Sequence, residues 1–261
     1  MQRHYAMAWL LLLSAFVLFA VASAFELPEV FGHKLKSSGI ADAIRGGVPG
    51  IIKKGAPTSL ADERECLIAA PCDTLPQRIL FIGDSMLEGL APRLAAYADK
   101  NGHTLYSVIW YSSTSEVWGR SDKLTSYIQR LKPTYIFVCL GANELFVSDI
   151  ERKRACYVEK IIADIDTIPF VWIGPPNWRK DTGINALIAS RTPQGAFFLS
   201  DGMSFERGHD GAHPTRESAT EWLDSVVRWM PANALHPIRL DMPEVPSARP
   251  TRSYVHQPGE R

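Results

Sequence analysis

The chain has 261 residues and 46% hydrophobic content, which is enough for one sizeable α/β domain with additional segments. Lysine plus arginine and aspartate plus glutamate both number 28, so the formal net charge at pH 7 is zero. This balance provides no global field that would attract nucleic acid or an anionic membrane surface, and we expect no nucleic-acid partner.

The first 24 residues are typical of an export signal. Arg3 and His4 precede an uncharged apolar stretch that closes in Ala22-Ser23-Ala24, a small-residue cleavage pattern. The uncharged stretch 5–25 also approaches the roughly 20 residues that span a bilayer, so an uncleaved signal anchor is the alternative. We expect an exported protein, periplasmic or secreted, that contacts a membrane only if this segment remains as an anchor.

Residues 25–77 contain scattered glycine, proline and charge without a sustained period, which predicts an irregular N-terminal extension with a short helix near Ala61–Ala69. Cys66 and Cys72 lie close together here, and export would permit a small-loop disulfide, with two free thiols as the alternative. The spacing of the four cysteines suggests no metal site, and neither CxxC nor HExxH occurs. We therefore expect neither a metal nor a cofactor.

From residue 78 to residue 230 the pattern alternates between strands and helices. The strands are predicted at 78–82, 104–110, 134–140, 170–173 and 196–199, and the helices at 85–100, 121–131, 149–166, 182–190 and 215–229. Such alternation predicts a parallel sheet covered by helices on both faces, with functional side chains at the carboxyl ends of the strands. Residues 231–261 form a proline-rich tail that we expect to wrap the surface or to be disordered.

A serine lies where the first predicted strand becomes a helix. Gly83-Asp84-Ser85 interrupts the apolar run Ile79–Ile82 just before a helical pattern begins. The free N–H groups and the positive dipole end of a helix start can stabilise an oxyanion, which suits a hydroxyl for acyl transfer. The ordinary alternative is a serine that only caps the helix.

Two further polar motifs follow predicted strands. Asn143 comes directly after the third strand, and its side-chain amide can donate to a developing oxyanion. Asp210 precedes His213 by three residues, so the carboxylate can hold one imidazole nitrogen while the other accepts a proton from Ser85. Each motif alone is an ordinary turn or helix start, but their joint occurrence in this order favours a catalytic site.

Together, Gly83-Asp84-Ser85, Gly141-x-Asn143 and Asp210-x-x-His213 resemble blocks I, III and V of the SGNH (GDSL-type) hydrolase family, over roughly residues 78–230. The resemblance implies a flavodoxin-like, three-layer α/β/α catalytic domain and ester chemistry without a metal. It implies that the serine is the nucleophile, that the histidine is the base, oriented by the aspartate, and that the serine N–H and the asparagine amide form an oxyanion hole.

The chain departs from this family in two places. The family expects a glycine as a second backbone donor in the loop after the second strand, where Gly119 is the favoured candidate and Ser115 the rival. The family commonly has aspartate after the asparagine, whereas this chain has Glu144, which we expect to support the loop.

The loop after the fourth strand contains Asn177, Trp178 and Arg179, which are candidate substrate contacts because an aromatic face with polar partners suits a sugar. We expect an exported serine esterase that acts on acyl esters, most simply acetyl esters, of carbohydrate. The alternatives within enzymes are a glycan O-acetyltransferase and a lysophospholipase-type lipid esterase. The alternative from another class is a non-catalytic glycan-binding or envelope scaffold protein.

Overall fold

The computed structural model describes residues 71–260, which belong to a compact unit comprising Cys66–Arg261. The predicted export signal and most of the N-terminal extension lie outside the described residues. Cys66 lies outside them too, so its pairing with Cys72 stays a prediction. None of the helices in the described part has the length and hydropathy of a membrane span.

The described chain alternates strands and helices in the predicted order. The strands are β1 (Arg78–Gly83), β2 (Thr104–Trp110), β3 (Tyr135–Cys139), β4 (Phe170–Ile173), β5 (Phe197–Phe198) and β6 (Arg252–His256). The helices are α3 (Leu87–Asn101), α4 (Ser115–Gly119), α5 (Lys123–Leu131), α6 (Ile150–Ile165), α7 (Ile184–Arg191) and α8 (Arg216–Asn233), with a 3₁₀ helix, η1 (Ala142–Glu144). Every strand and helix predicted from residue 78 onward is present, and α4, η1 and β6 are additional, whereas the helix predicted near Ala61–Ala69 lies outside the described residues.

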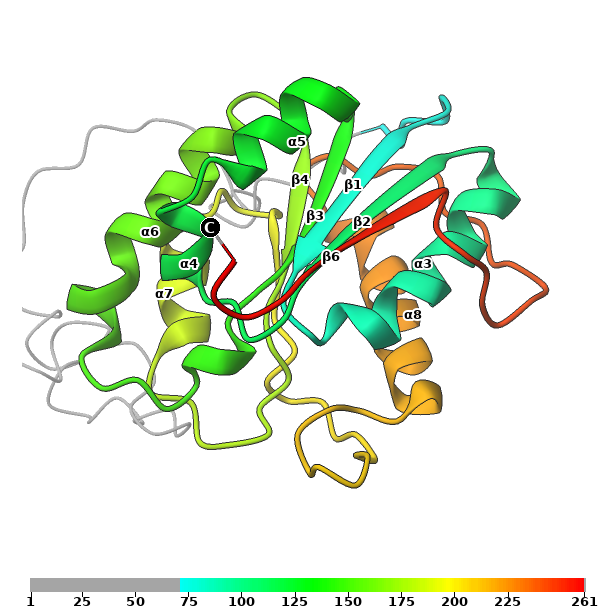
Figure 1. Ribbon diagram of the computed structural model, residues 1–261. Helices are drawn as coiled ribbons and strands as arrows, with labels where there is room; N and C mark the ends of the chain where they lie inside the picture. Colours follow the sequence, from blue (N-terminus) through cyan, green and yellow to red (C-terminus); the bar gives the residue numbers. More distant parts are fainter. Residues whose placement is uncertain (1–70, 261) are drawn as a thin grey trace, which may run out of the picture. The chain divides into compact units, whose positions relative to one another are not determined.

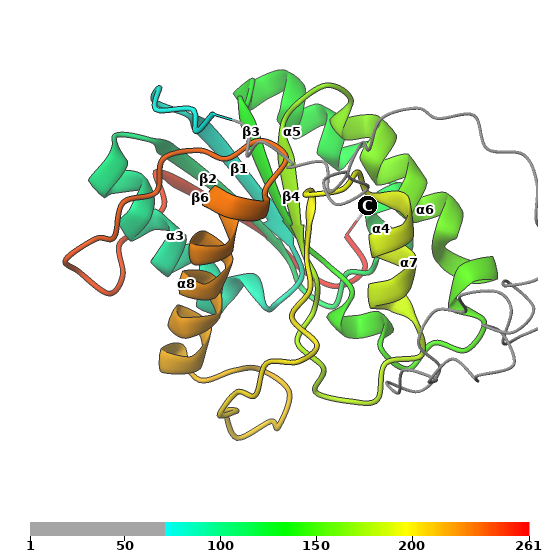
Figure 2. The ribbon, with the colours of Figure 1, turned by 180° about the vertical axis from the view of Figure 1, so that it is seen from behind.

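All six strands are parallel and lie in the order β5-β4-β3-β1-β2-β6. Without β6, this is the flavodoxin-like order 2-1-3-4-5. Helices α3 and α8 cover one face of the sheet, and α4 to α7 cover the other (Figures 1 and 2). The predicted three-layer α/β/α architecture is therefore confirmed.

The proline-rich tail contributes to this sheet, which we did not predict. Strand β6 pairs in parallel with β2, so that Tyr254 lies opposite Val108. The side chains of β6 are exposed or half-buried, and Pro250 and Pro258 flank the strand rather than interrupt it. The tail prediction is corrected for Arg252–His256, because a short edge strand needs neither a continuous apolar run nor full burial.

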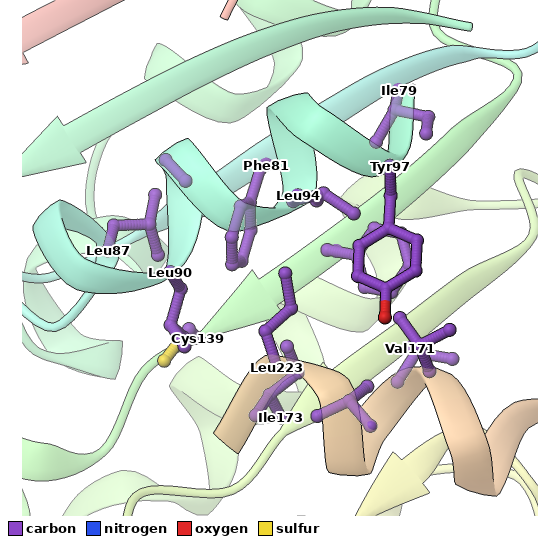
Figure 3. Packing of buried hydrophobic residues seen from close by; sticks show 14 of the residues in the cluster. Ile79, Phe81, Leu87, Leu90, Leu94, Tyr97, Cys139, Val171, Ile173 and Leu223 are labelled. Carbon is purple, nitrogen blue, oxygen red and sulfur yellow. The ribbon is translucent and has the colours of Figure 1, made fainter. Parts of the chain in front are cut away.

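The core forms two apolar layers because both faces of the sheet are covered. Successive residues of β1 point to opposite faces, so Phe81 packs on the α3 and α8 side while Leu80 packs on the other. Figure 3 shows Leu87, Leu90 and Leu94 of α3 directed at the sheet and at Leu223 of α8. Their spacing places all three on one helix face, which fixes α3 and hence the turn that precedes it.

Candidate active site

Ser85 lies in the turn between β1 and α3, and the backbone of this turn is tightly constrained. The Asp84 N–H donates to the carbonyl of Cys139 in β3 (3.2 Å), and the Asp84 carboxylate accepts from the N–H of Met86 (3.0 Å). A Cβ at Gly83 would lie 2.2 Å from the same Cys139 carbonyl, so only glycine permits the two strands to end this closely. The turn therefore holds the Ser85 backbone in one position.

The Ser85 hydroxyl does not cap α3. The N-cap residue of that helix is Met86, and no side-chain hydrogen bond caps it. The hydroxyl instead lies 2.7 Å from Nε2 of His213. The structure therefore does not support the alternative in which Ser85 only caps the helix.

The three motif residues Ser85, His213 and Asp210 form one continuous hydrogen-bond chain. His213 Nδ1 lies 2.6 Å from Asp210 Oδ2, and Nε2 of the same ring faces the serine oxygen. With the Nδ1 proton donated to the carboxylate, Nε2 is left to accept the serine proton. The geometry has the donor and acceptor order of a nucleophile, a base and an orienting acid.

Asp210 is held by its own turn as well as by the imidazole. Its Oδ1 accepts from the N–H groups of Ala212 (2.9 Å) and His213 (3.0 Å). The His213 ring, followed by these two backbone N–H groups, holds the pKa of the Asp210 carboxyl well below its usual range. Gly211 adopts φ of 68°, the left-handed conformation that this turn requires. The carboxylate is therefore ionised wherever the protein is folded at ordinary pH.

Asn143 lies in η1, directly after β3, and reaches across to the loop that follows β2. Its side-chain Nδ2 donates to the carbonyl of Ser113 (3.0 Å), which uses one of its two amide protons. The indole N–H of Trp178 donates to the carbonyl of Ala142 (3.0 Å) and so braces the same short helix. The Asn143 amide is thus oriented from two sides.

Glu144 joins these two loops from the interior. Its side chain is fully buried and accepts from the Ser115 N–H (2.9 Å), the Ser115 hydroxyl (2.7 Å) and the guanidinium of Arg154 (2.7 Å). Burial raises the pKa of the Glu144 carboxyl, and the Ser115 and Arg154 contacts oppose this change. The loop-supporting role expected for Glu144 agrees with these contacts.

The two candidates for the second backbone donor differ in this structure, and the role of Gly119 as a donor stays a prediction. The Ser115 N–H is already bonded to the Glu144 carboxylate. Gly119 ends α4, and a Cβ there would lie 3.0 to 3.1 Å from atoms of Tyr157, including its backbone. Glycine is needed at this position because α4 packs closely on α6. In contrast, the backbone N–H of Ser85 has no partner among the described residues.

A buried carboxyl, that of Asp84, lies next to Ser85 in the same turn. Asp84 is fully buried, and its Oδ2 has no hydrogen-bond partner among residues 71–260. Desolvation raises the pKa of Asp84 to about 7, with a smaller increase from Glu144, while the Met86 N–H and His213 act in the opposite direction. The ionisation of Asp84 therefore changes near neutral pH.

A groove of about 540 Å³ opens beside Ser85 and His213. Its walls come from the start of α3, the start of α8 and a C-terminal segment: Met86, Glu88, Gly89, Pro92, Pro214, Arg216, Ala219, Ser247, Ala248 and Arg249. A larger cavity of about 800 Å³ lies around Tyr127 and His256 but includes none of the motif residues. The groove is the cavity relevant to the motif residues, because Ser85 and His213 line it.

The predicted substrate contacts lie outside the groove. The Asn177 side-chain oxygen accepts from Asn185 (3.1 Å), and the Arg179 guanidinium stacks 4.6 Å over the ring of Trp178. Trp178 is half-buried and bonds to the loop of Asn143, so its contacts in this structure are internal. Their role toward a substrate stays a prediction.

The described residues hold no group of three or more histidine, cysteine, aspartate or glutamate side chains arranged to bind a metal ion. Sequence reasoning missed Ser113, Arg154 and the groove arginines Arg216 and Arg249. Nothing in their local pattern distinguishes them from ordinary loop or helix-surface residues, because their positions depend on chain segments far apart in sequence.

No protein-family model and no curated protein matches the chain. Among solved structures, the chain is similar to the psychrotrophic esterase EstA from Pseudoalteromonas sp., in a structure inhibited by monoethylphosphonate. The similarity has a TM-score of 0.42 and 16% sequence identity, and it covers 59% of this chain and 98% of that one.

Proposed function

We propose that the protein is an ester hydrolase in which Ser85 is the nucleophile, His213 the general base and Asp210 the orienting acid. The observation that carries this proposal is the unbroken chain of short hydrogen bonds, 2.6 Å from Asp210 to His213 and 2.7 Å from His213 to Ser85. Such a chain deprotonates a serine hydroxyl as it attacks a carbonyl carbon.

In the first half of the reaction, the Ser85 oxygen bonds to the ester carbonyl carbon and its proton passes to Nε2 of His213. The carbonyl oxygen becomes an oxyanion, which the unpartnered Ser85 N–H and the remaining Asn143 amide proton are available to hold. The loss of one such donor typically raises the barrier by about 3 to 4 kcal/mol. The carbon–oxygen bond to the alcohol then breaks, and the alcohol leaves with the proton from His213.

The second half reverses these roles with water as the nucleophile. His213 accepts a proton from water as the water oxygen bonds to the acyl carbon. The acyl–Ser85 bond breaks, the acid is released, and the proton returns to the serine oxygen. Asp210 stays ionised throughout, because the contacts that lower its pKa persist through both halves.

The acyl group that fits this proposal best is short, and acetyl is the simplest. The groove beside Ser85 is walled by small residues such as Gly89, Ala219 and Ala248, and Met86 is its one large aliphatic side chain. A lipid esterase would need a broad apolar wall for a long chain. Carbohydrate is the proposed alcohol, and the N-terminal segment supports an exported, periplasmic or secreted location.

The proposal is tested by steady-state hydrolysis of p-nitrophenyl acetate. Ser85→Ala should reduce kcat by at least about 10⁴-fold, because the remaining groups cannot form an acyl-enzyme. Ser225→Ala is the matched control: this hydroxyl donates to the Glu221 carbonyl and accepts from Arg228 on α8, outside the groove, so kcat should be unchanged. Full turnover by folded Ser85→Ala would refute the assignment of the nucleophile.

A further inference from the structure

Two arginines in the groove have no internal partner. Arg216 is the first residue of α8, and Arg249 belongs to the C-terminal segment that leads to β6, yet both line the cavity that contains Ser85 and His213. Both side chains are exposed, and within the described part of the chain neither forms an ion pair, a side-chain hydrogen bond or a ring contact. Other arginines, such as Arg93 and Arg154, are paired with carboxylates.

Arg249 belongs to a C-terminal segment that hydrogen bonds hold against α3 and α8. The buried guanidinium of Arg93 binds Asp224 (2.7 Å) and donates to the carbonyl of Val245 (2.9 Å), which fastens the segment to α3 and α8. The Ala248 N–H then donates to the Pro92 carbonyl of α3 (2.9 Å). Anchors on both sides of Ser247 hold this wall against α3, next to the groove floor.

The balance of charge in the groove is positive. Glu88 is the acidic residue among its lining side chains, and the hydroxyl of Tyr111 donates to its carboxylate. Asp210 is engaged by the imidazole and by two backbone N–H groups. Two guanidinium groups therefore face the cavity against one carboxylate, so an anionic ligand is attracted to the position beside the nucleophile.

We propose that the groove binds the carboxylate of an acidic glycan through Arg216 and Arg249 while an acetyl ester of the same glycan reaches Ser85. This assignment rests on the proposed ester hydrolysis and adds the substrate class. Guanidinium groups match the planar geometry of carboxylates and form paired hydrogen bonds with them. The cavity of about 540 Å³ is in the size range of sugar-sized ligands.

The small groove walls favour a sugar over a phospholipid as the source of the negative charge. Gly89, Pro92, Ala219 and Ala248 leave room for a ring but provide no long apolar surface for an acyl chain. Because α3 and α8 approach each other at Gly89 and Ala219, the groove floor is closed beneath them. A short acyl group on a charged sugar satisfies both the shape and the charge of this site.

The test compares two acetyl esters that differ only at C6, which is a carboxylate in methyl glucuronide and a hydroxymethyl group in methyl glucoside; both are acetylated at the same hydroxyl. The wild-type protein should hydrolyse the glucuronide ester with a kcat/KM about tenfold higher, mainly through a lower KM, and added salt should reduce the ratio. Arg216→Gln and Arg249→Gln should each lower the ratio, and the double variant should bring it close to one. Arg228→Gln, on α8 but outside the groove, should keep the wild-type ratio.

The two proposals fail in different ways. Equal kcat/KM values for the two esters in the wild-type protein would overturn the acidic-glycan assignment but not the proposed ester hydrolysis. A preference for a lysophospholipid over both sugar esters would have the same consequence. If neither ester is hydrolysed, calorimetry can test separately whether the groove binds an acidic glycan. The experiment measures binding of an unesterified oligouronate to Ser85→Ala. The assignment is supported if Ser85→Ala binds the oligouronate and if adding Arg216→Gln and Arg249→Gln abolishes this binding. It is overturned if Ser85→Ala does not bind the oligouronate.

Discussion

Glu144 accepts two hydrogen bonds from Ser115, one from its N–H at 2.9 Å and one from its hydroxyl at 2.7 Å. Glu144 ends η1, which follows β3, and Ser115 begins α4, which follows β2, so one buried carboxylate joins the segments that leave two strands. The same carboxylate pairs with Arg154 of α6. The position of Asn143, one residue before Glu144, depends on this junction.

Removal of the Glu144 carboxylate should therefore be costly. In Glu144→Ala, Ser115 and Arg154 lose a buried partner, and we expect the free energy of unfolding to fall by about 3 to 5 kcal/mol. Glu144→Gln keeps one acceptor and should cost less. Urea unfolding at pH 7 measures both variants, and an alanine variant as stable as the glutamine variant would contradict the role of the carboxylate.

Asp210→Asn should impair turnover while preserving the fold. The carboxamide oxygen can still accept from Ala212 and His213, but the site loses the negative charge that selects the imidazole tautomer. We expect kcat for p-nitrophenyl acetate to fall by about 10³ to 10⁴-fold. Because Asp210 is exposed, thermal unfolding should change little. A loss of less than about tenfold in kcat would argue against the orienting role.

Asp84 should make the stability of the protein depend on pH. Its pKa in the folded state is raised from 3.8 to about 7, so the folded protein binds this proton more tightly than the unfolded chain does. The contribution is fully present below the unfolded value and is lost as the pH rises from about 4 through about 7. The free energy of unfolding should therefore decline across this window.

Asp84→Asn isolates this effect, because the amide oxygen can still accept from the Met86 N–H while the ionisable group is absent. The variant should show a flatter pH dependence between pH 4 and pH 7 when urea midpoints are compared. Parallel curves for wild type and variant would show that Asp84 does not titrate in this window.

The contact between α3 and α8 should tolerate no added volume. A Cβ at Gly89 would lie 2.6 Å from the Cβ of Ala219, so Gly89→Ala must separate the two helices. We expect a loss of about 1 to 3 kcal/mol in the free energy of unfolding and a lower kcat, since α3 begins directly after Ser85 and Met86. The matched control is Gly89→Ala combined with Ala219→Gly, which should restore both. Failure of this second change to rescue the first would mean that the helices are not coupled at this contact.

Much of the fold could be predicted because its strands are buried on both faces and therefore form continuous apolar runs. Strand β6 is different: it lies at the sheet edge, its side chains are exposed or half-buried, and the segment around it is rich in proline. Its pairing depends on Val108 and its neighbours in β2, far away in sequence. A local pattern cannot contain that information.

The motif residues could be predicted for a related reason. Parallel strands bring the loops of Ser85 and Asn143 to one edge of the sheet, and the loop before α8 carries His213 to the same edge. The choice between Ser115 and Gly119 as the second backbone donor could not be made from the sequence. Both lie in α4, where Glu144 engages the Ser115 N–H and packing on Tyr157 requires glycine at position 119. Thr114 caps α4 by accepting a hydrogen bond from the Val117 N–H. Threonine is a favoured N-cap residue, so its presence here is a local sequence signal for the start of this helix.

Covalent labelling tests whether the Ser85 hydroxyl is the activated nucleophile. A fluorophosphonate reagent, which bonds its phosphorus to an activated serine oxygen with loss of fluoride, should modify one peptide, and mass spectrometry should place the adduct on Ser85. Labelling should be absent in Ser85→Ala and much slower in His213→Ala, because the base at 2.7 Å from the hydroxyl has been removed. An adduct on a different serine, or wild-type labelling rates in His213→Ala, would contradict the account.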